Sequence, residues 1–145
     1  MMNYGALRER REAADAFSAH NGIYVTSVSE GAAEAAMEVT DASLNPYAAV
    51  HGGALFTLCD ITGGAAAASH GISAVTLDSD VHFLRPALNC TRLVARATEL
   101  KRGRRALVYR LQVFNQDETL LVDGTFTYMT VNVPVGGKDA SEGRA

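Results

Sequence analysis

The sequence contains little cysteine, and this scarcity limits the chemistry that it can support. Cys59 and Cys90 are the only two among its 145 residues, and neither belongs to a Cys-x-x-Cys pair. Such usage suggests neither a disulfide framework nor a cysteine-rich zinc site. We therefore expect no bound metal ion and a reducing, cytoplasmic location.

Long apolar runs and an excess of positive charge are also missing. No segment approaches the roughly 20 apolar residues of a membrane-spanning helix, and the N-terminus has no apolar run of signal-peptide length. Thirteen Lys and Arg against sixteen Asp and Glu give a net charge of -3, which argues against a nucleic-acid surface. We expect a protein that is neither secreted nor membrane-inserted and that binds no nucleic acid.

What is present is the composition of an ordinary soluble domain, with 48% hydrophobic and 20% charged residues. The length fits one domain. Residues 1–20 are rich in helix formers and end at the turn signal Asn21-Gly22, which predicts one leading helix. Residues 21–132 form the main domain, and residues 133–145 are predicted to be a disordered tail.

The pattern of the main domain predicts an α+β fold. Strand-like runs at residues 23–28 and 33–39 precede a predicted helix at residues 54–69, which ends before Gly71. Four segments with a period of two follow, at about 75–83, 92–98, 107–113 and 119–131, and their short connections require antiparallel pairing. A helix that is apolar on nearly all sides is a buried helix. We expect an antiparallel sheet of about six strands wrapped around one long central helix.

Asp60 is the one formally charged residue between Asp41 and Asp78. It could lie on a narrow exposed stripe of the helix, or be tied to a backbone amide or an arginine. Aspartate is a poor helix former, and an ion in an apolar setting costs several kcal/mol unless it is compensated. Asp60 is therefore a candidate catalytic carboxylate.

The segment His51-Gly52-Gly53 opens the same helix. Its backbone N–H groups, strengthened by the helix dipole, could hold a developing oxyanion, or the glycines could simply allow a tight turn. Gly52 and Asp60 are about 12 Å apart along one helix, too far to act on one carbonyl group. If they cooperate, they do so across the interface of a two-fold dimer.

Several motifs together resemble one known family. The sequence is similar to the hotdog-fold acyl-CoA thioesterases of the phenylacetate-pathway (PaaI-type) branch, over roughly residues 13–130. The shared motifs are His20-Asn21-Gly22-Ile23, Met37-x-Val39, Asn45, His51-Gly52-Gly53, Phe56-x-Leu58-x-Asp60, Val75-Thr76, Phe83-Leu84-Arg85-Pro86-Ala87, Gly103-Arg104 and Gly124-Thr125-Phe126.

The resemblance implies an acyl-CoA thioesterase without metal or organic cofactor, built as a homodimer with shared sites and usually paired again into a homotetramer. It assigns Asp60 as nucleophile or general base and Gly52 as the oxyanion donor. Other residues of the predicted site are Asn45, His51, Gly53 and Thr76, together with Arg85 and Arg104 near the CoA phosphates. Arg104 belongs to the dense basic turn of residues 101–105, which could also be an ordinary solvated turn.

Three functions remain open from these residues. Hydrolysis of an acyl-CoA, for example phenylacetyl-CoA or another aryl-CoA, accounts for both Asp60 and the glycine turn. A hotdog enoyl-CoA hydratase or dehydratase would aim His51 and Asp60 at one substrate, and a non-catalytic acyl-CoA binding module would need neither. His70, which follows the helix, is expected to bond the last helical carbonyls.

Overall fold

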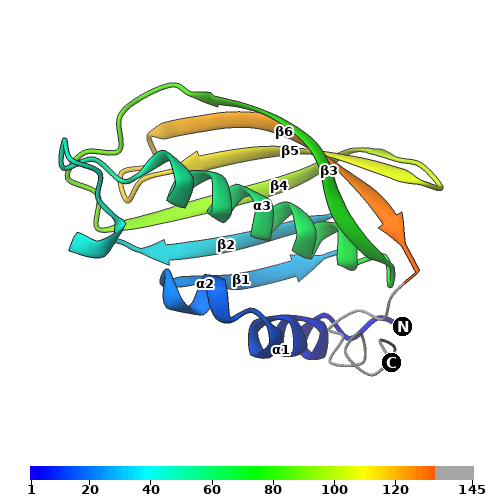
Figure 1. The fold of residues 1–145 in the computed structure, drawn as a ribbon. Coiled ribbons are helices and arrows are strands. Elements are labelled where there is room, and N and C mark those ends of the chain that lie inside the picture. Colours follow the sequence, from blue (N-terminus) through cyan, green and yellow to red (C-terminus); the bar gives the residue numbers. More distant parts are fainter. Residues whose placement is uncertain (133–145) are drawn as a thin grey trace, which may run out of the picture.

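The computed structural model describes residues 1–132, so the predicted tail at 133–145 lies outside the described residues. These described residues form a single antiparallel sheet of six strands in the order β1-β2-β4-β5-β6-β3, with one long helix against it (Figure 1). The elements are α1 (Tyr4–Ala14), α2 (Ala16–His20), β1 (Ile23–Ser29), β2 (Ala32–Glu38), η1 (Asp41–Ser43), α3 (Gly52–Ala68), β3 (Ser73–Phe83), β4 (Arg92–Arg102), β5 (Ala106–Phe114) and β6 (Leu120–Val131).

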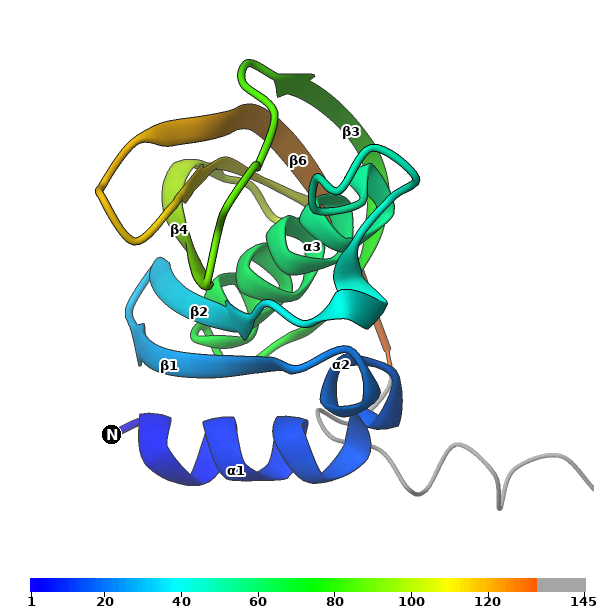
Figure 2. The same ribbon diagram turned by 90° about the vertical axis from the view of Figure 1, so that its left-hand side faces the viewer.

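The sheet curves around α3, as Figures 1 and 2 show from two directions. Alternate residues of β2, β4, β5 and β6 face the helix and form the core, among them Ala35, Ala95, Leu111 and Phe126, each 0% exposed. This alternation is the period of two that the sequence predicts. The α+β architecture is thereby confirmed, and the strand and helix limits differ from the predicted ones by only a few residues at most ends.

The leading segment differs from the prediction, because two helices replace the single expected one. Asp15 ends α1 and caps α2, where its carboxylate accepts hydrogen bonds from the backbone N–H of Ser18 at 3.0 Å and from its hydroxyl at 2.7 Å. Aspartate is a strong N-cap, and such a side chain competes with a continuous helix. After the break, α1 lies alongside β1 and α2 lies at the start of this strand (Figure 2).

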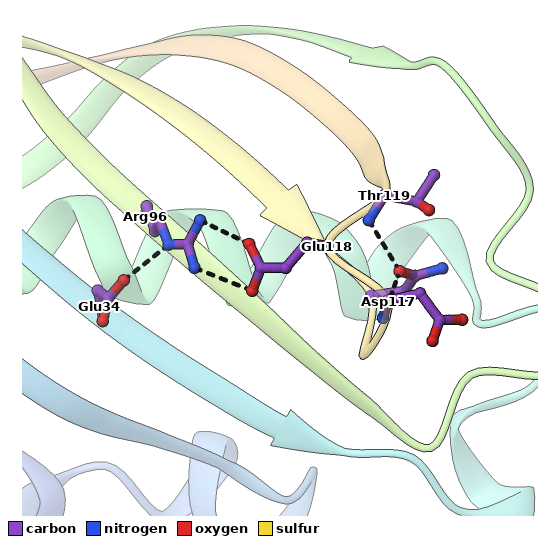
Figure 3. Close-up of polar contacts among 6 residues, drawn as sticks. Glu34, Arg96, Asp117, Glu118 and Thr119 are labelled. Carbon is purple, nitrogen blue, oxygen red and sulfur yellow. Dashed lines mark hydrogen bonds and ion pairs between the residues drawn. The ribbon is translucent and has the colours of Figure 1, made fainter.

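An ion-pair network holds the face of the sheet that points away from α3 (Figure 3). Arg96 on β4 donates to Glu34 on β2 at 2.8 Å and to both carboxylate oxygens of Glu118, at 3.1 and 3.2 Å. In the turn that carries Glu118, the side-chain oxygen of Asn115 accepts from the backbone N–H groups of Asp117 and Thr119. The turn between β5 and β6 is thereby tied to the middle of the sheet.

The backbone N–H of His70 donates to the carbonyl of Ala67 at 3.3 Å, as expected for a residue at the helix end, but its side chain binds elsewhere. Its Nε2 lies 2.5 Å from Oε2 of Glu99 on β4, and the hydroxyl of Tyr109 donates to the same oxygen at 2.9 Å. Burial favours a raised pKa for Glu99, but the hydrogen bonds from His70 and Tyr109 outweigh burial, and the pKa is lowered below its usual value of 4.5. The cluster joins the end of α3 to the sheet.

This lowered pKa predicts an acid-sensitive contribution to stability. A carboxyl whose pKa is lower in the folded state stabilises the fold above its unfolded pKa, and the contribution disappears as the pH falls through the folded value. Glu99→Gln should therefore lower the free energy of unfolding at pH 7 by about 1–3 kcal/mol. The difference from wild type should shrink below pH 4.5, as measured by urea unfolding. The control is Glu9→Gln on the exposed side of α1. A loss of unfolding free energy in Glu99→Gln that is the same at every pH would contradict the lowered pKa of Glu99 as its cause.

Candidate active site

The start of α3 presents one backbone donor that has no partner in the described part of the chain. His51 caps the helix by accepting the N–H of Gly53 on its Nδ1 at 2.9 Å, and its own N–H donates to Ser43 at 2.8 Å. The N–H of Gly53 is thereby occupied. The N–H of Gly52 has no recorded hydrogen bond within residues 1–132, as expected for the first residue of a helix. Of the two glycines, Gly52 can therefore offer its N–H to a ligand.

Asn45 shapes the loop that leads into this helix. Its side-chain oxygen accepts the backbone N–H groups of Tyr47 at 2.9 Å and Ala49 at 3.1 Å, and its own N–H donates to the carbonyl of Ala49 at 2.7 Å. These bonds close a compact turn around Pro46. The structure therefore places Asn45 on the same loop as His51, with its carbonyl oxygen engaged in holding that loop.

Asp60 lies on a partly exposed stripe of α3, although the rest of the helix is largely buried. The expectation of a helix buried on nearly all sides is therefore wrong for this stripe within one chain. The hydroxyl of Thr76, on the neighbouring edge strand β3, donates to Oδ1 of Asp60 at 2.5 Å. The sequence placed both residues in the site, and the structure brings them into contact. An oriented carboxylate with solvent access can act on water or on a carbonyl carbon.

Tyr128 on β6 is a residue of this site that sequence reasoning missed. Its hydroxyl donates to the backbone carbonyl of Asp60 at 2.8 Å and lies 3.4 Å from Oδ1 of the same residue. Burial, followed by the negative charge of Asp60, raises the pKa of Tyr128, so the hydroxyl stays protonated and remains a donor. Only its alternating place on a strand was visible in the sequence, and that pattern predicts core packing alone.

The close contact between α3 and Tyr128 depends on Gly63. A methyl group at this position would lie 2.2 Å from the hydroxyl oxygen of Tyr128, whereas one at Gly64 would lie 3.0 Å from Nη2 of Arg11. The second neighbour is the end of a flexible side chain and can move. Gly63 is therefore the residue that lets the tyrosine reach Asp60.

The comparisons with known proteins agree with this geometry. The family model of the thioesterase superfamily matches residues 47–122, more than half of the chain. The chain belongs to that superfamily. It is 36% identical over 104 residues to the acyl-coenzyme A thioesterase PaaI of Escherichia coli K12. The aligned region covers 72% of this chain and 74% of that protein.

Solved structures extend the likeness to the whole fold. The structure of E. coli PaaI matches with a TM-score of 0.82 at 28% identity, over 91% of this chain and 99% of that chain. A Streptococcus mutans protein bound to acetyl CoA matches with a TM-score of 0.71 at 33% identity, over 75% and 88% of the two chains. This chain is a PaaI-type hotdog thioesterase, and therefore a thioester hydrolase.

Two basic residues predicted for this thioesterase lie at opposite ends of the sheet. Arg85 follows β3 and donates to the carbonyl of Leu120 at 2.8 Å. A methyl group at Gly52 would lie 3.7 Å from the ring of Phe83, so Arg85 shares an end of the molecule with Gly52. Arg104 lies in the turn between β4 and β5, near Thr130, at the end where β3 begins. The two ends of β3 are about 30 Å apart, so one chain does not bring both arginines to one phosphate group.

Cys59 adjoins Asp60 in the sequence but takes no part in the site of this thioesterase. Its side chain is 0% exposed, and burial, with the nearby charge of Asp60, raises the pKa of the thiol to about 12. A thiol that stays protonated is a poor nucleophile. Cys59 packs in the core.

The packing of Gly63 leads to a testable prediction. Gly63→Ala should displace Tyr128, and we expect it to lower both thermal stability and thioesterase activity, despite the gain in helix propensity of about 1 kcal/mol for alanine. Gly64→Ala carries the same gain, would approach only the flexible end of Arg11 at 3.0 Å, and serves as the matched control. Melting temperature and kcat measure the two effects. Equal behaviour of the two variants would show that the contact with Tyr128 is unimportant.

Proposed function

We propose that this thioesterase hydrolyses acyl-CoA to a free acid and coenzyme A, with Asp60 as its catalytic carboxylate. The observation that carries the proposal is the contact of Asp60 with Thr76, because it orients a carboxylate on the otherwise apolar helix and leaves Oδ2 without a recorded partner among residues 1–132. The acetyl-CoA complex of the Streptococcus mutans relative and the coenzyme A complex of a Streptococcus pneumoniae relative support this class of substrate.

In the proposed reaction, the N–H of Gly52 stabilises the negative charge that develops on the thioester oxygen. As general base, Asp60 takes a proton from the attacking water, the C–S bond breaks, and the proton passes to the leaving thiolate. As nucleophile, it first forms a mixed anhydride with release of the thiol, and water then cleaves the anhydride. Both routes use only water and protein groups. Single-turnover hydrolysis in ¹⁸O-labelled water separates them, because only the second can carry label into the carboxylate, through attack of water on the aspartyl carbonyl of the anhydride.

The proposed site requires two chains. Gly52 and Asp60 are about 12 Å apart along α3, so each acts with its counterpart from a partner. Strand β3 is an edge of the sheet and exposes apolar side chains, with Val75 48% and Leu77 57% accessible. An exposed apolar edge of this kind is a ready pairing surface. We propose a two-fold homodimer through β3, paired again into a homotetramer.

The remaining assignments follow from this arrangement. Arg85 shares the end of the molecule that carries Gly52, and we propose that it contacts the CoA phosphates, with Arg104 approaching from the other chain. An aryl acyl group such as phenylacetyl is the proposed substrate type, in line with the phenylacetic acid degradation operon of the E. coli relative. Two free thiols support a reducing, cytoplasmic setting. No helix within residues 1–132 is long and apolar enough to cross a membrane.

Removal of the carboxylate tests the proposed chemistry. Asp60→Asn keeps the shape of the side chain and should lower kcat for acyl-CoA hydrolysis by roughly 10²-fold or more, as followed by thiol release. Thr76→Val should cost roughly tenfold because the carboxylate loses its orienting donor, whereas Thr76→Ser keeps the hydroxyl and should stay near wild type. Wild-type turnover by a folded Asp60→Asn enzyme would exclude the proposed role.

The donor at Gly52 can be removed without disturbing the helix. Proline is well tolerated at the first helical position and has no N–H, and the extended conformation of His51, with ψ of 136°, suits a residue before proline. Gly52→Pro should lower kcat by about 10²–10³-fold. Gly52→Ala keeps the N–H and, with room beside Phe83, should retain nearly full activity.

Mixed dimers test the shared site directly. Asp60→Asn and Gly52→Pro chains, each inactive alone, should regain about a quarter of wild-type activity when refolded together, because half of the dimers then contain one intact site. If both residues served a site within one chain, the mixture would stay inactive.

A further inference from the structure

An open cavity of about 360 Å³ lies between the N-terminal helices and the sheet, beside the helix that carries Asp60. Its apolar wall includes Ile23 and Val25 of β1, Ile61 of α3 and Ala19 of α2. This volume is in the range of small-molecule sites and is larger than the roughly 150 Å³ of a cavity that holds benzene. An acyl group of moderate length fits such a space.

Arg11 of α1 brings a positive charge to this cavity. Within residues 1–132, its guanidinium has no recorded hydrogen bond or ion pair. Burial lowers the pKa of Arg11, and the nearby negative charge of Asp15, and to a lesser extent Asp60, opposes this effect. A partly buried donor without an acceptor is costly. The cavity therefore offers N–H groups that a ligand can satisfy.

The other charged groups of the cavity limit which ligand this can be. Asp15 already accepts two hydrogen bonds from Ser18, and Glu38 accepts from Tyr24 at 2.7 Å and from Arg92 at 3.2 Å. Together with Glu12, these carboxylates outnumber the guanidinium. A further carboxylate would add repulsion, whereas an uncharged oxygen accepts from Arg11 without that cost.

The cavity borders the same stretch of α3 as Asp60, although Asp60 itself does not line it. Ile61 follows Asp60 directly and lines the cavity, and Nη2 of Arg11 would lie 3.0 Å from a methyl group placed at Gly64, one turn further along. Residues at this spacing lie on one side of a helix. An acyl group whose carbonyl carbon is at Asp60 can therefore extend along α3 into the cavity.

We propose that this cavity holds the acyl group and that Arg11 is a specificity-determining residue, donating a hydrogen bond to an uncharged oxygen, a hydroxyl or a ketone, at the far end of the acyl chain. The inference rests on the proposed acyl-CoA hydrolysis. It names α1 and α2 as the distal wall of the acyl site and predicts that, among acyl-CoAs of equal length, those with a neutral polar terminus are preferred.

The test is a series of straight-chain acyl-CoAs of increasing length, each with a methyl, hydroxyl or carboxyl terminus. At the best length, wild-type kcat/KM should favour the hydroxyl-ended over the methyl-ended substrate by roughly 10-fold or more, as expected for a hydrogen bond to a charged group, and the carboxyl-ended substrate should be poorest. Arg11→Met should bring the hydroxyl-to-methyl ratio close to one, and Arg11→Lys should restore part of it. Arg10→Met, on the exposed side of the same helix, should leave the ratio unchanged.

Two further results separate specificity from structure. Ala19→Leu narrows the cavity from the wall formed by α2. It should lower kcat/KM for long acyl-CoAs and leave kcat/KM for acetyl-CoA unchanged, a readout that does not depend on how Arg11 variants fold. A ratio that survives Arg11→Met, or a uniform loss for every substrate in that variant, would overturn the inference. If wild-type protein released thiol from no acyl-CoA, the proposed function itself would fail.

Discussion

The close approach of α3 to strand β6 is the constraint on which the rest of the site depends. Gly63 leaves no side chain between the helix and Tyr128, so the tyrosine hydroxyl reaches the backbone carbonyl of Asp60 at 2.8 Å. The run of small residues that follows, Ala65 to Ala68, is almost entirely buried. A sheet can curl around a helix at such short range only where the helix is thin, because close-packed interiors leave no spare volume.

This contact also explains how one carboxylate is held on an apolar helix. Tyr128 on β6 donates a hydrogen bond to the backbone carbonyl of Asp60, and Thr76 on the edge strand β3 orients the carboxylate. Asp60 stays partly exposed, so the full cost of burying an ion is not incurred. The helix start is organised separately, since His51 occupies the N–H of Gly53 and leaves that of Gly52 without a recorded partner in the described chain. The two halves of the proposed site are thus each preorganised but distant within one chain.

Much of the fold could be predicted because its elements carry local signals. The alternation in β4, β5 and β6 and the neutral run of α3 predict a sheet around a helix, whereas the order of the strands was not predicted and comes from the structure. The break of the leading segment at Asp15 was missed, since helix propensity favours a continuous helix and only the capping contacts with Ser18 favour a break. His70 was assigned to the helix end, although Glu99, 29 residues away, is its partner.

Sequence alone determined that Asp60 is the one charged residue of a long neutral segment and that glycines open its helix. It also determined that Gly52 and Asp60 are too far apart along that helix to serve one carbonyl group. These conclusions depend on composition and on helical rise, which are local properties. Only the tertiary structure decided which side chains surround Asp60, which of the two glycine N–H groups is occupied, and that Arg11 lines a cavity beside the site. Those facts depend on how distant segments pack, and burial and hydrogen bonding between such segments leave no periodic pattern in the chain.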